Sequence, residues 1–296
     1  MASKRAASLV LLFLLLTGAG TGLPAQAPTL DELLERAEAT LRRSIPALVN
    51  IVAQEEYSQQ ARVSSPGRVM TGSRRLKSDV LFVRQPGAGG DWILFRDVFE
   101  VGGAPLPHDP ERLVRLFVKP PPDAAEQIGA IAAESQKHHF AGAIAAVTNP
   151  FVGVALLQPN YRPRLRFSGG GVDRAVGRGV RAARFRELDG RADGLEPLFV
   201  EGRAEGTIWI DDVTGRVVKT EVWPHARDIT QPMTATTFTF DSRLGVMVPV
   251  EMRTTWYANG STPRSRAAVT GTATYGTFRR FEVDASMTLT WPSRLQ

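Results

Sequence analysis

Apolar and polar positions alternate with a period of two over much of the chain after residue 74, which is typical of β-strands with one buried face. The clearest case is 246–256, where one face carries Val246, Val248, Val250, Met252, Thr254 and Trp256. Residues 74–101 have the pattern of a hairpin around the glycine-rich turn 86–90. Further strands are predicted at 164–167, 178–188 and 202–210, with 168–171 as a turn.

Two stretches follow the helical spacing instead. In 29–45, Thr29 and Glu32 have the spacing of a capping box. One face of this helix carries Leu30, Leu33, Leu34, Ala37 and Leu41, and Pro46 is expected to end or kink it. The second stretch, 123–158, begins at Asp123 and is predicted to hold helices inserted between two sets of strands.

These elements predict an α+β fold. A long series of one-sided strands must hide its apolar face by curling or under helices. We therefore expect a curved, unclosed antiparallel β-barrel or sheet with the helices of 29–45 and 123–158 packed on the concave face. A parallel sheet is not favoured, because no helices alternate with the strands after residue 162.

The first residues have the three zones of an export signal. Lys4 and Arg5 precede an apolar stretch at 9–16, and 25–27 is a small-x-small cleavage site. The apolar stretch is much shorter than the roughly 20 residues that span a bilayer, which disfavours the alternative of a retained anchor. The sequence predicts a signal peptide at 1–27 and a single domain at 28–296, with a helical insertion at about 105–160.

Composition narrows the class of protein. The chain has no cysteine, so disulfides cannot stabilise it and no lipidated cysteine can anchor it. The net charge is +6, of which Lys4 and Arg5 of the leader contribute +2. The basic residues are scattered rather than clustered, which does not favour a nucleic-acid partner. We expect a periplasmic or secreted protein, cleaved near Ala27, without a stable membrane anchor.

A search for catalytic and metal-binding patterns gives no site. His138 and His139 are adjacent, and neighbours on a helix point about 100° apart. The chain has no His-Glu-x-x-His pattern and no Gly-x-Ser-x-Gly elbow. Glu55 and Glu56 are candidates for acid–base chemistry, but consecutive strand residues point to opposite faces. A structural ion pair with the region of Arg74 and Arg75 is the competing interpretation. No catalytic residue, metal or cofactor is therefore predicted.

Two segments in the second half of the chain have a familiar pattern. One is Gly206-Thr207-Ile208-Trp209-Ile210-Asp211, which continues through 214–215 into 217–221. The other is 238–241 followed by 244–245 and 248–252. Over about 200–285 these segments resemble the periplasmic lipoprotein carriers of the LolA/LolB type. The resemblance implies an unclosed barrel lidded by helices, an interior that holds acyl chains, and no catalytic residues. Residues 55–60, 74–83, 92–101 and 275–281 also resemble uncharacterised exported bacterial proteins of similar length.

The resulting expectation is a non-enzymatic carrier or sensor for a lipid or lipid-modified protein in the bacterial envelope. Two alternatives remain: a periplasmic scaffold or assembly protein with a filled core, and a hydrolase whose site assembles only in space. The oligomeric state is not predicted. For the carrier, the expected apolar lining is Val80, Phe82, Ile208, Ile210, Val248, Val250 and Met252.

Overall fold

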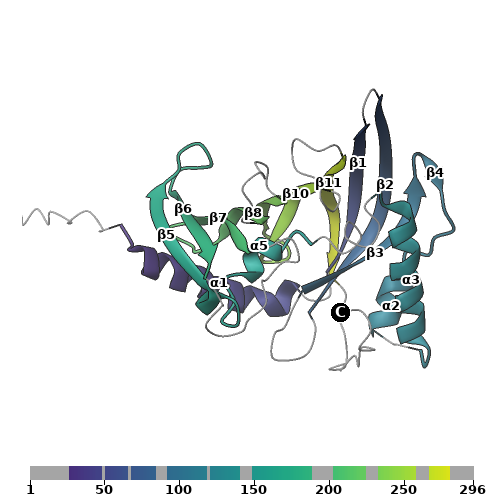
Figure 1. The fold of residues 1–296 in the computed structure, drawn as a ribbon. Coiled ribbons are helices and arrows are strands. Elements are labelled where there is room, and N and C mark those ends of the chain that lie inside the picture. The colour runs from purple at the N-terminus through teal and green to yellow at the C-terminus, as the bar shows by residue number, and fades with distance from the viewer. Residues whose placement is uncertain are drawn as a thin grey trace, which may run out of the picture.

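A single antiparallel sheet of 11 strands forms the body of the computed structural model, in the order β4-β3-β2-β1-β11-β10-β9-β8-β7-β6-β5 (Figure 1). The structure describes residues 27–48, 51–65, 68–84, 92–118, 121–140, 149–188, 203–224, 233–257 and 267–280. The predicted leader, apart from Ala27, and the predicted turn at 86–90 lie outside these ranges.

Two antiparallel meanders make up this sheet. The first strand set is β1 (Ile51–Ser65), β2 (Arg68–Arg84), β3 (Trp92–Val101) and β4 (Ala104–Pro105). The second is β5 (Leu165–Val172), β6 (Val180–Glu187), β7 (Ala204–Asp211), β8 (Val217–Pro224), β9 (Thr234–Asp241), β10 (Val246–Tyr257) and β11 (Ala267–Arg280). β11 pairs with β1 and joins the two sets, while β4 and β5 form opposite edges. The sheet is thus curved and unclosed, as the strand pattern predicts (Figure 1).

Helices lie before the sheet and between its two strand sets. α1 (Leu30–Leu48) precedes β1, and α2 (Arg112–Val118), α3 (Ala124–His138) and α5 (Val152–Ala155) form the predicted insertion. The capping box is confirmed, because the Thr29 amide donates to Glu32 Oε2 over 2.7 Å and the Glu32 amide donates to Thr29 Oγ1 over 3.3 Å. Pro46 does not end α1, which continues to Leu48.

The sheet has two buried faces at its β1–β3 end. Ile51, Ala53 and Val80 belong to a large apolar cluster with α1 and α5. Their sequence neighbours Val52 and Leu81 belong to a second cluster with α2 and α3. We call the side facing α1 and α5 the inner face and the opposite side the outer face.

The prediction that all helices pack on one face is therefore wrong for α2 and α3. Leu113 and Leu116 of α2, with Ile128 and Ile131 of α3, pack on the outer face around Phe95. The reason is the sequence of β2 and β3, where runs of apolar residues supply both faces of each strand. A strand that is apolar on both sides needs cover on both sides.

Most predicted strands are confirmed, with one correction at 168–171. These residues belong to β5 rather than to a turn, because they pair with β6: Ser168 lies opposite Arg184, and Gly169 lies opposite Ala183. The glycines instead produce a bulge, with a positive φ of 91° at Gly169 and 85° at Gly170. Glycine tolerates this conformation because it has no Cβ.

Candidate functional site

The inner face gathers six of the seven residues predicted to line an interior. Val80, Phe82, Ile208, Ile210, Val248 and Met252 are all at most 2% exposed and belong to one apolar cluster. Val250 does not join them and is 41% exposed. The pairing of β10 with β9 shifts between Pro249 and Glu251, and this bulge turns Val250 to the solvent. The expected placement of Val250 is therefore wrong.

Side chains of α1 and α5 pack directly on these residues. Leu33, Leu34 and Ala37 of α1 belong to the same cluster and are at most 2% exposed. Just before α5, the Phe151 ring meets the Phe82 ring edge-on, with centroids 5.1 Å apart, and the Phe238 ring at 5.6 Å. Packing of this kind is what the scaffold alternative predicts for the inner face. Binding of a ligand by the six residues remains a prediction.

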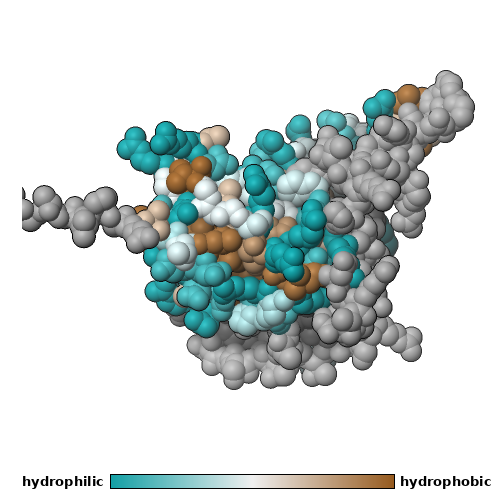
Figure 2. Space-filling view, turned by 60° about the vertical axis from the view of Figure 1, so that its left-hand side comes forward, coloured by the Kyte–Doolittle hydropathy of each residue, from teal (hydrophilic) through white to brown (hydrophobic). Residues whose placement is uncertain are grey.

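A groove opens between α1 and the chain that enters β5. Its volume is about 480 Å³, and it is lined by Asp31, Leu34, Glu38, Pro159, Arg162, Pro163, Leu165 and Phe167. Leu34 and Leu165 are members of the inner apolar cluster, so the groove reaches the core. At its rim, Arg162 Nη1 lies 2.6 Å from Glu38 Oε2. Figure 2 shows apolar side chains gathered on this end of the molecule and framed by hydrophilic ones.

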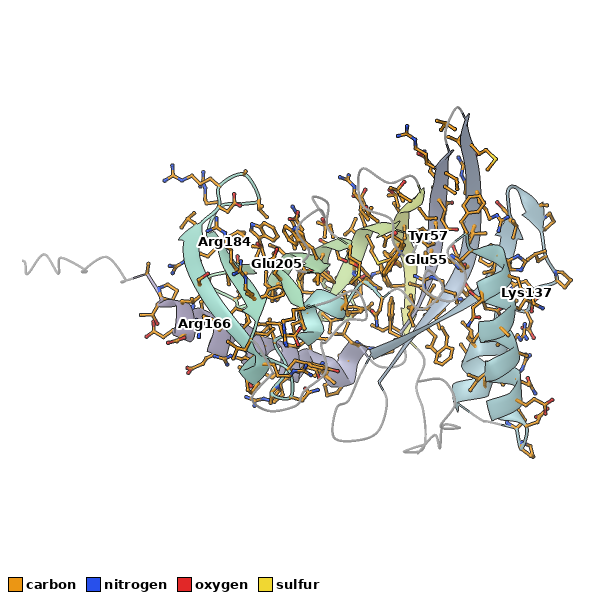
Figure 3. All side chains as sticks on the ribbon, viewed as in Figure 1. Glu55, Tyr57, Lys137, Arg166, Arg184 and Glu205 are labelled. Atoms are coloured by element: carbon orange, nitrogen blue, oxygen red, sulfur yellow. The ribbon has the colours of Figure 1, made fainter. Side chains whose placement is uncertain are left out.

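The inner face also holds a buried ion pair. Arg96 of β3 donates to Glu55 of β1 from Nε over 2.5 Å and from Nη2 over 3.0 Å, and both side chains are fully buried. Burial alone would lower the pKa of Arg96, but the Glu55 carboxylate outweighs it and raises this pKa. Figure 3 shows Glu55 beside Tyr57 on β1.

This geometry decides between acid–base chemistry and a structural ion pair, the two interpretations of Glu55 and Glu56. Glu55 is 1% exposed, whereas Glu56 is exposed on the opposite face, as expected for neighbours on a strand. The structural ion pair exists, but its partner is Arg96 rather than Arg74 or Arg75. Sequence alone could not find Arg96, because the pairing depends on β2 lying between β1 and β3.

His139 lies at the end of α3 against the same polar group. The side-chain oxygen Oε1 of Gln59 accepts a hydrogen bond from the Phe140 backbone amide over 3.2 Å. The side-chain nitrogen Nε2 of Gln59 therefore faces His139 Nδ1, also at 3.2 Å. This arrangement makes Nδ1 an acceptor and places the imidazole proton on Nε2. Burial, with further contributions from Arg96, His138 and Arg74, lowers the pKa of His139 to about 3, so the ring is neutral at pH 7.

A buried histidine with a perturbed pKa is a feature we expect of a hydrolase site. The hydrogen-bond partners of His139 decide whether it could act in one. A triad needs a nucleophile on one ring nitrogen and an orienting carboxylate on the other. His139 has Gln59 on Nδ1, and Nε2 has no hydrogen-bond partner within the described ranges. The described residues therefore do not assemble a Ser-His-Asp site around His139.

Two aspartates face each other on the outer face. Asp79 of β2 and Asp97 of β3 are cross-strand partners, 2% and 6% exposed. His108 Nε2 lies 3.3 Å from Asp79 Oδ2, and Arg112 Nη1 lies 3.5 Å from Asp97 Oδ1. Burial raises the pKa of both carboxyl groups, against the opposing effect of these bases. Across the described part of the chain, no group of three or more histidine, cysteine, aspartate or glutamate side chains has the geometry to hold a metal ion.

Several solved structures are remotely similar to this chain, including the following three. A putative outer membrane lipoprotein-sorting protein domain from Vibrio parahaemolyticus has 9% identity and a TM-score of 0.37, covering 83% of this chain and 93% of its own. A DUF1329 family protein from Desulfovibrio piger has 10% identity and a TM-score of 0.34, and a LolA superfamily protein from Nitrosomonas europaea has 11% and 0.30. Both pairings cover 86% of this chain and 95% of the other. No family model and no curated protein matches the chain.

Membrane-spanning helices are not found in the described ranges, where every helix is too short or too polar to cross a bilayer.

Proposed function

We propose that this protein is an exported, non-enzymatic carrier or sensor that binds the acyl chain of a lipid or lipid-modified protein in the bacterial envelope. The observation that carries the proposal is the groove between α1 and β5, whose floor is part of the inner apolar cluster. Its volume of about 480 Å³ falls within the range of small-molecule sites. The leader at 1–27 and the absence of cysteine support an exported protein without a lipid anchor.

The groove suits an alkyl chain better than a polar ligand. Leu34, Pro159, Pro163, Leu165 and Phe167 supply apolar contacts along it. Burying one methylene group yields about 0.8 kcal/mol, so a long acyl chain can bind without a strong polar contact. Arg162 and Glu38 at the rim neutralise each other. The six buried residues of the predicted lining do not line the groove itself, but they belong to the same apolar cluster as Leu34 and Leu165 of the groove.

Binding of a fluorescent fatty acid tests this proposal. Mature protein is stripped of endogenous lipid and titrated with cis-parinaric acid. Phe167→Ser removes a groove side chain, and we expect binding to weaken at least tenfold. Val172→Ser changes an exposed residue of the same strand, 57% exposed, and should leave binding unchanged.

Two results would contradict the carrier. If stripped wild-type protein binds no probe, the acyl-carrier function is wrong. If Phe167→Ser and Val172→Ser bind equally well, the site is not this groove. Native mass spectrometry of protein from its own envelope adds an independent measure, because a carrier should retain a lipid.

The scaffold remains a second candidate, and the packing of α1 and α5 on the inner face favours it. Leu33 and Ala37 are at most 1% exposed, so α1 already covers much of the surface that a ligand would need. A scaffold should be purified with a bound protein and no lipid, and the same mass-spectrometric measurement distinguishes the two.

A further inference from the structure

A row of polar side chains crosses the inner face beside the Glu55–Arg96 ion pair. It runs from Tyr57 on β1 to Thr254 on β10, then to Thr234 and Thr236 on β9, and ends at Thr220 on β8. We call this set the polar lane. All five residues are at most 2% exposed, and His139 lies at its β1 end, with its ring 5.5 Å from the Tyr57 ring. The strand pattern alone does not reveal the lane, because threonine is common on either face of a strand.

The strand register makes the lane continuous. Thr254 lies directly opposite Thr234, and Thr236 lies directly opposite Thr220, so each pair has Cβ atoms roughly 5 Å apart. The Tyr57 hydroxyl reaches across β11 to Thr254 Oγ1 at 2.9 Å. Gly271 of β11 permits this crossing, since a Cβ there would lie 2.4 Å from the Tyr57 ring.

Several donors of the lane have nothing to bond with. The hydroxyls of Thr220, Thr234 and Thr236 make no hydrogen bond within the parts of the chain that the structure describes, and neither does His139 Nε2. Gln59 places the ring proton of His139 on Nε2, so this atom is a donor. Buried polar groups are nearly always paired in native proteins, and each exception needs an explanation.

We infer that the polar lane binds the oxygen-bearing part of a neutral acyl ester, such as the ester and glycerol oxygens of an acylglycerol. This inference rests on the proposed function and names the class of ligand. The hydroxyls of Thr234 and Thr236 can donate to or accept from ligand oxygens, and His139 Nε2 can donate to a carbonyl. Thr220 lies under Gly153 of α5, where a Cβ would come within 2.7 Å of its hydroxyl, so it closes the lane rather than meeting the ligand. The lane offers no free charge to a carboxylate or a phosphate, because Arg96 is already paired with Glu55.

Two ligands with the same chain length test the inference. We compare 1-monomyristoylglycerol with tetradecane, each displacing cis-parinaric acid from stripped protein. The variant T234V/T236V keeps the side-chain shape and removes two hydroxyls. The control Thr237→Val changes an exposed residue on the opposite face of the same strand.

The expected result is selective. T234V/T236V should bind monomyristoylglycerol about tenfold more weakly and tetradecane as tightly as the wild type, while Thr237→Val should change neither. The resistance of T234V/T236V to urea should not fall, because a buried hydroxyl without a hydrogen-bond partner costs desolvation free energy and does not stabilise the folded state.

Three results would overturn the inference. Unchanged binding of both ligands by T234V/T236V would show that the lane touches no ligand and would leave the carrier function standing. A large loss of resistance to urea would show that the hydroxyls are bonded within the protein. If monomyristoylglycerol does not displace bound probe from wild-type protein, the inference fails, while the carrier function stands because the bound fatty acid itself supports it.

Discussion

The two ends of the sheet bury charge very differently on the outer face. At the β1–β3 end, helices cover both faces, and each face holds ionisable groups that are almost fully buried: Glu55 and Arg96 inside, Asp79 and Asp97 outside. At the β5–β7 end, Glu187 is buried and paired with Arg164 over 2.9 Å, but charged residues of the outer face remain largely in water. Figure 3 shows three of them, Arg166, Arg184 and Glu205, at this end.

This difference indicates that burial of a sheet face by helices, rather than the type of ion pair, decides how much a charged residue changes the free energy of unfolding. A buried charge that loses its partner keeps its full desolvation cost. An exposed pair is solvated with or without its partner and is screened by salt. The same kind of substitution should therefore have large effects near β1 and small effects on the outer face of β6.

Removing Arg96 should give the largest effect. Arg96→Met leaves the Glu55 carboxylate buried without its partner, and we expect a loss of about 3–5 kcal/mol in the free energy of unfolding. The measurement is urea unfolding followed by circular dichroism. Adding Glu55→Leu to Arg96→Met should restore much of the loss. A loss below about 1 kcal/mol for the single variant would show that the pair does not control the stability of this end.

The pH dependence of stability should report His139. Burial lowers its pKa from 6.5 to about 3, so between these values the unfolded chain binds more protons than the folded protein. Stability must therefore fall as the pH drops through this window. From pH 7 to pH 5, wild-type protein should lose about 2 kcal/mol more than His139→Phe. Parallel pH profiles of the two proteins would contradict the burial of a neutral ring.

Asp79 should change the pH dependence of stability in the opposite direction to His139 and by a smaller amount. Burial raises its pKa, against the pull of His108 and Arg279. A raised carboxyl pKa contributes stability that is present below the unfolded pKa and is lost as the pH rises through the folded pKa. Raising the pH from 3 to 7 should therefore cost wild-type protein more stability than Asp79→Asn. Urea unfolding at both pH values measures this, and a larger cost for the variant would refute the assignment.

The exposed pair at the β6 end should give the smallest effect. Arg186 Nε lies 3.4 Å from Glu205 Oε2, with side-chain exposures of 67% and 28%. Arg186→Ala should change the free energy of unfolding by less than about 1 kcal/mol, and added salt should reduce even that. A loss comparable to that of Arg96→Met would remove the contrast between the two ends.

Much of the fold follows from local patterns in the sequence. The two-residue alternation locates most strands, and the capping box at Thr29 and Glu32 marks the start of α1. The apolar run at 80–83 carried more information than the alternation, because a strand that is apolar on both sides indicates cover on both faces. That run indicates that both faces of β2 are covered, but the identity of α2 and α3 as the cover of the outer face comes from the tertiary structure.

Local sequence patterns do not predict the candidate sites. The groove is formed by α1 and the entry to β5, which are more than 100 residues apart in the sequence. The polar lane exists because β10, β9 and β8 pair in a register that aligns their threonines. Val250 has the right parity for the inner face, yet the bulge in β10 turns it to solvent.

The sequence by itself determined the period of each strand, the amphipathic face of α1 and the absence of disulfides, because these depend on neighbouring residues and composition. Only the tertiary structure decided which charges are buried together and which hydroxyls line up across strands. Arg96 meets Glu55 from two strands away, and Tyr57 meets Thr254 across Gly271. These contacts depend on strand order and register, which long-range pairing of the whole sheet sets and no local pattern encodes.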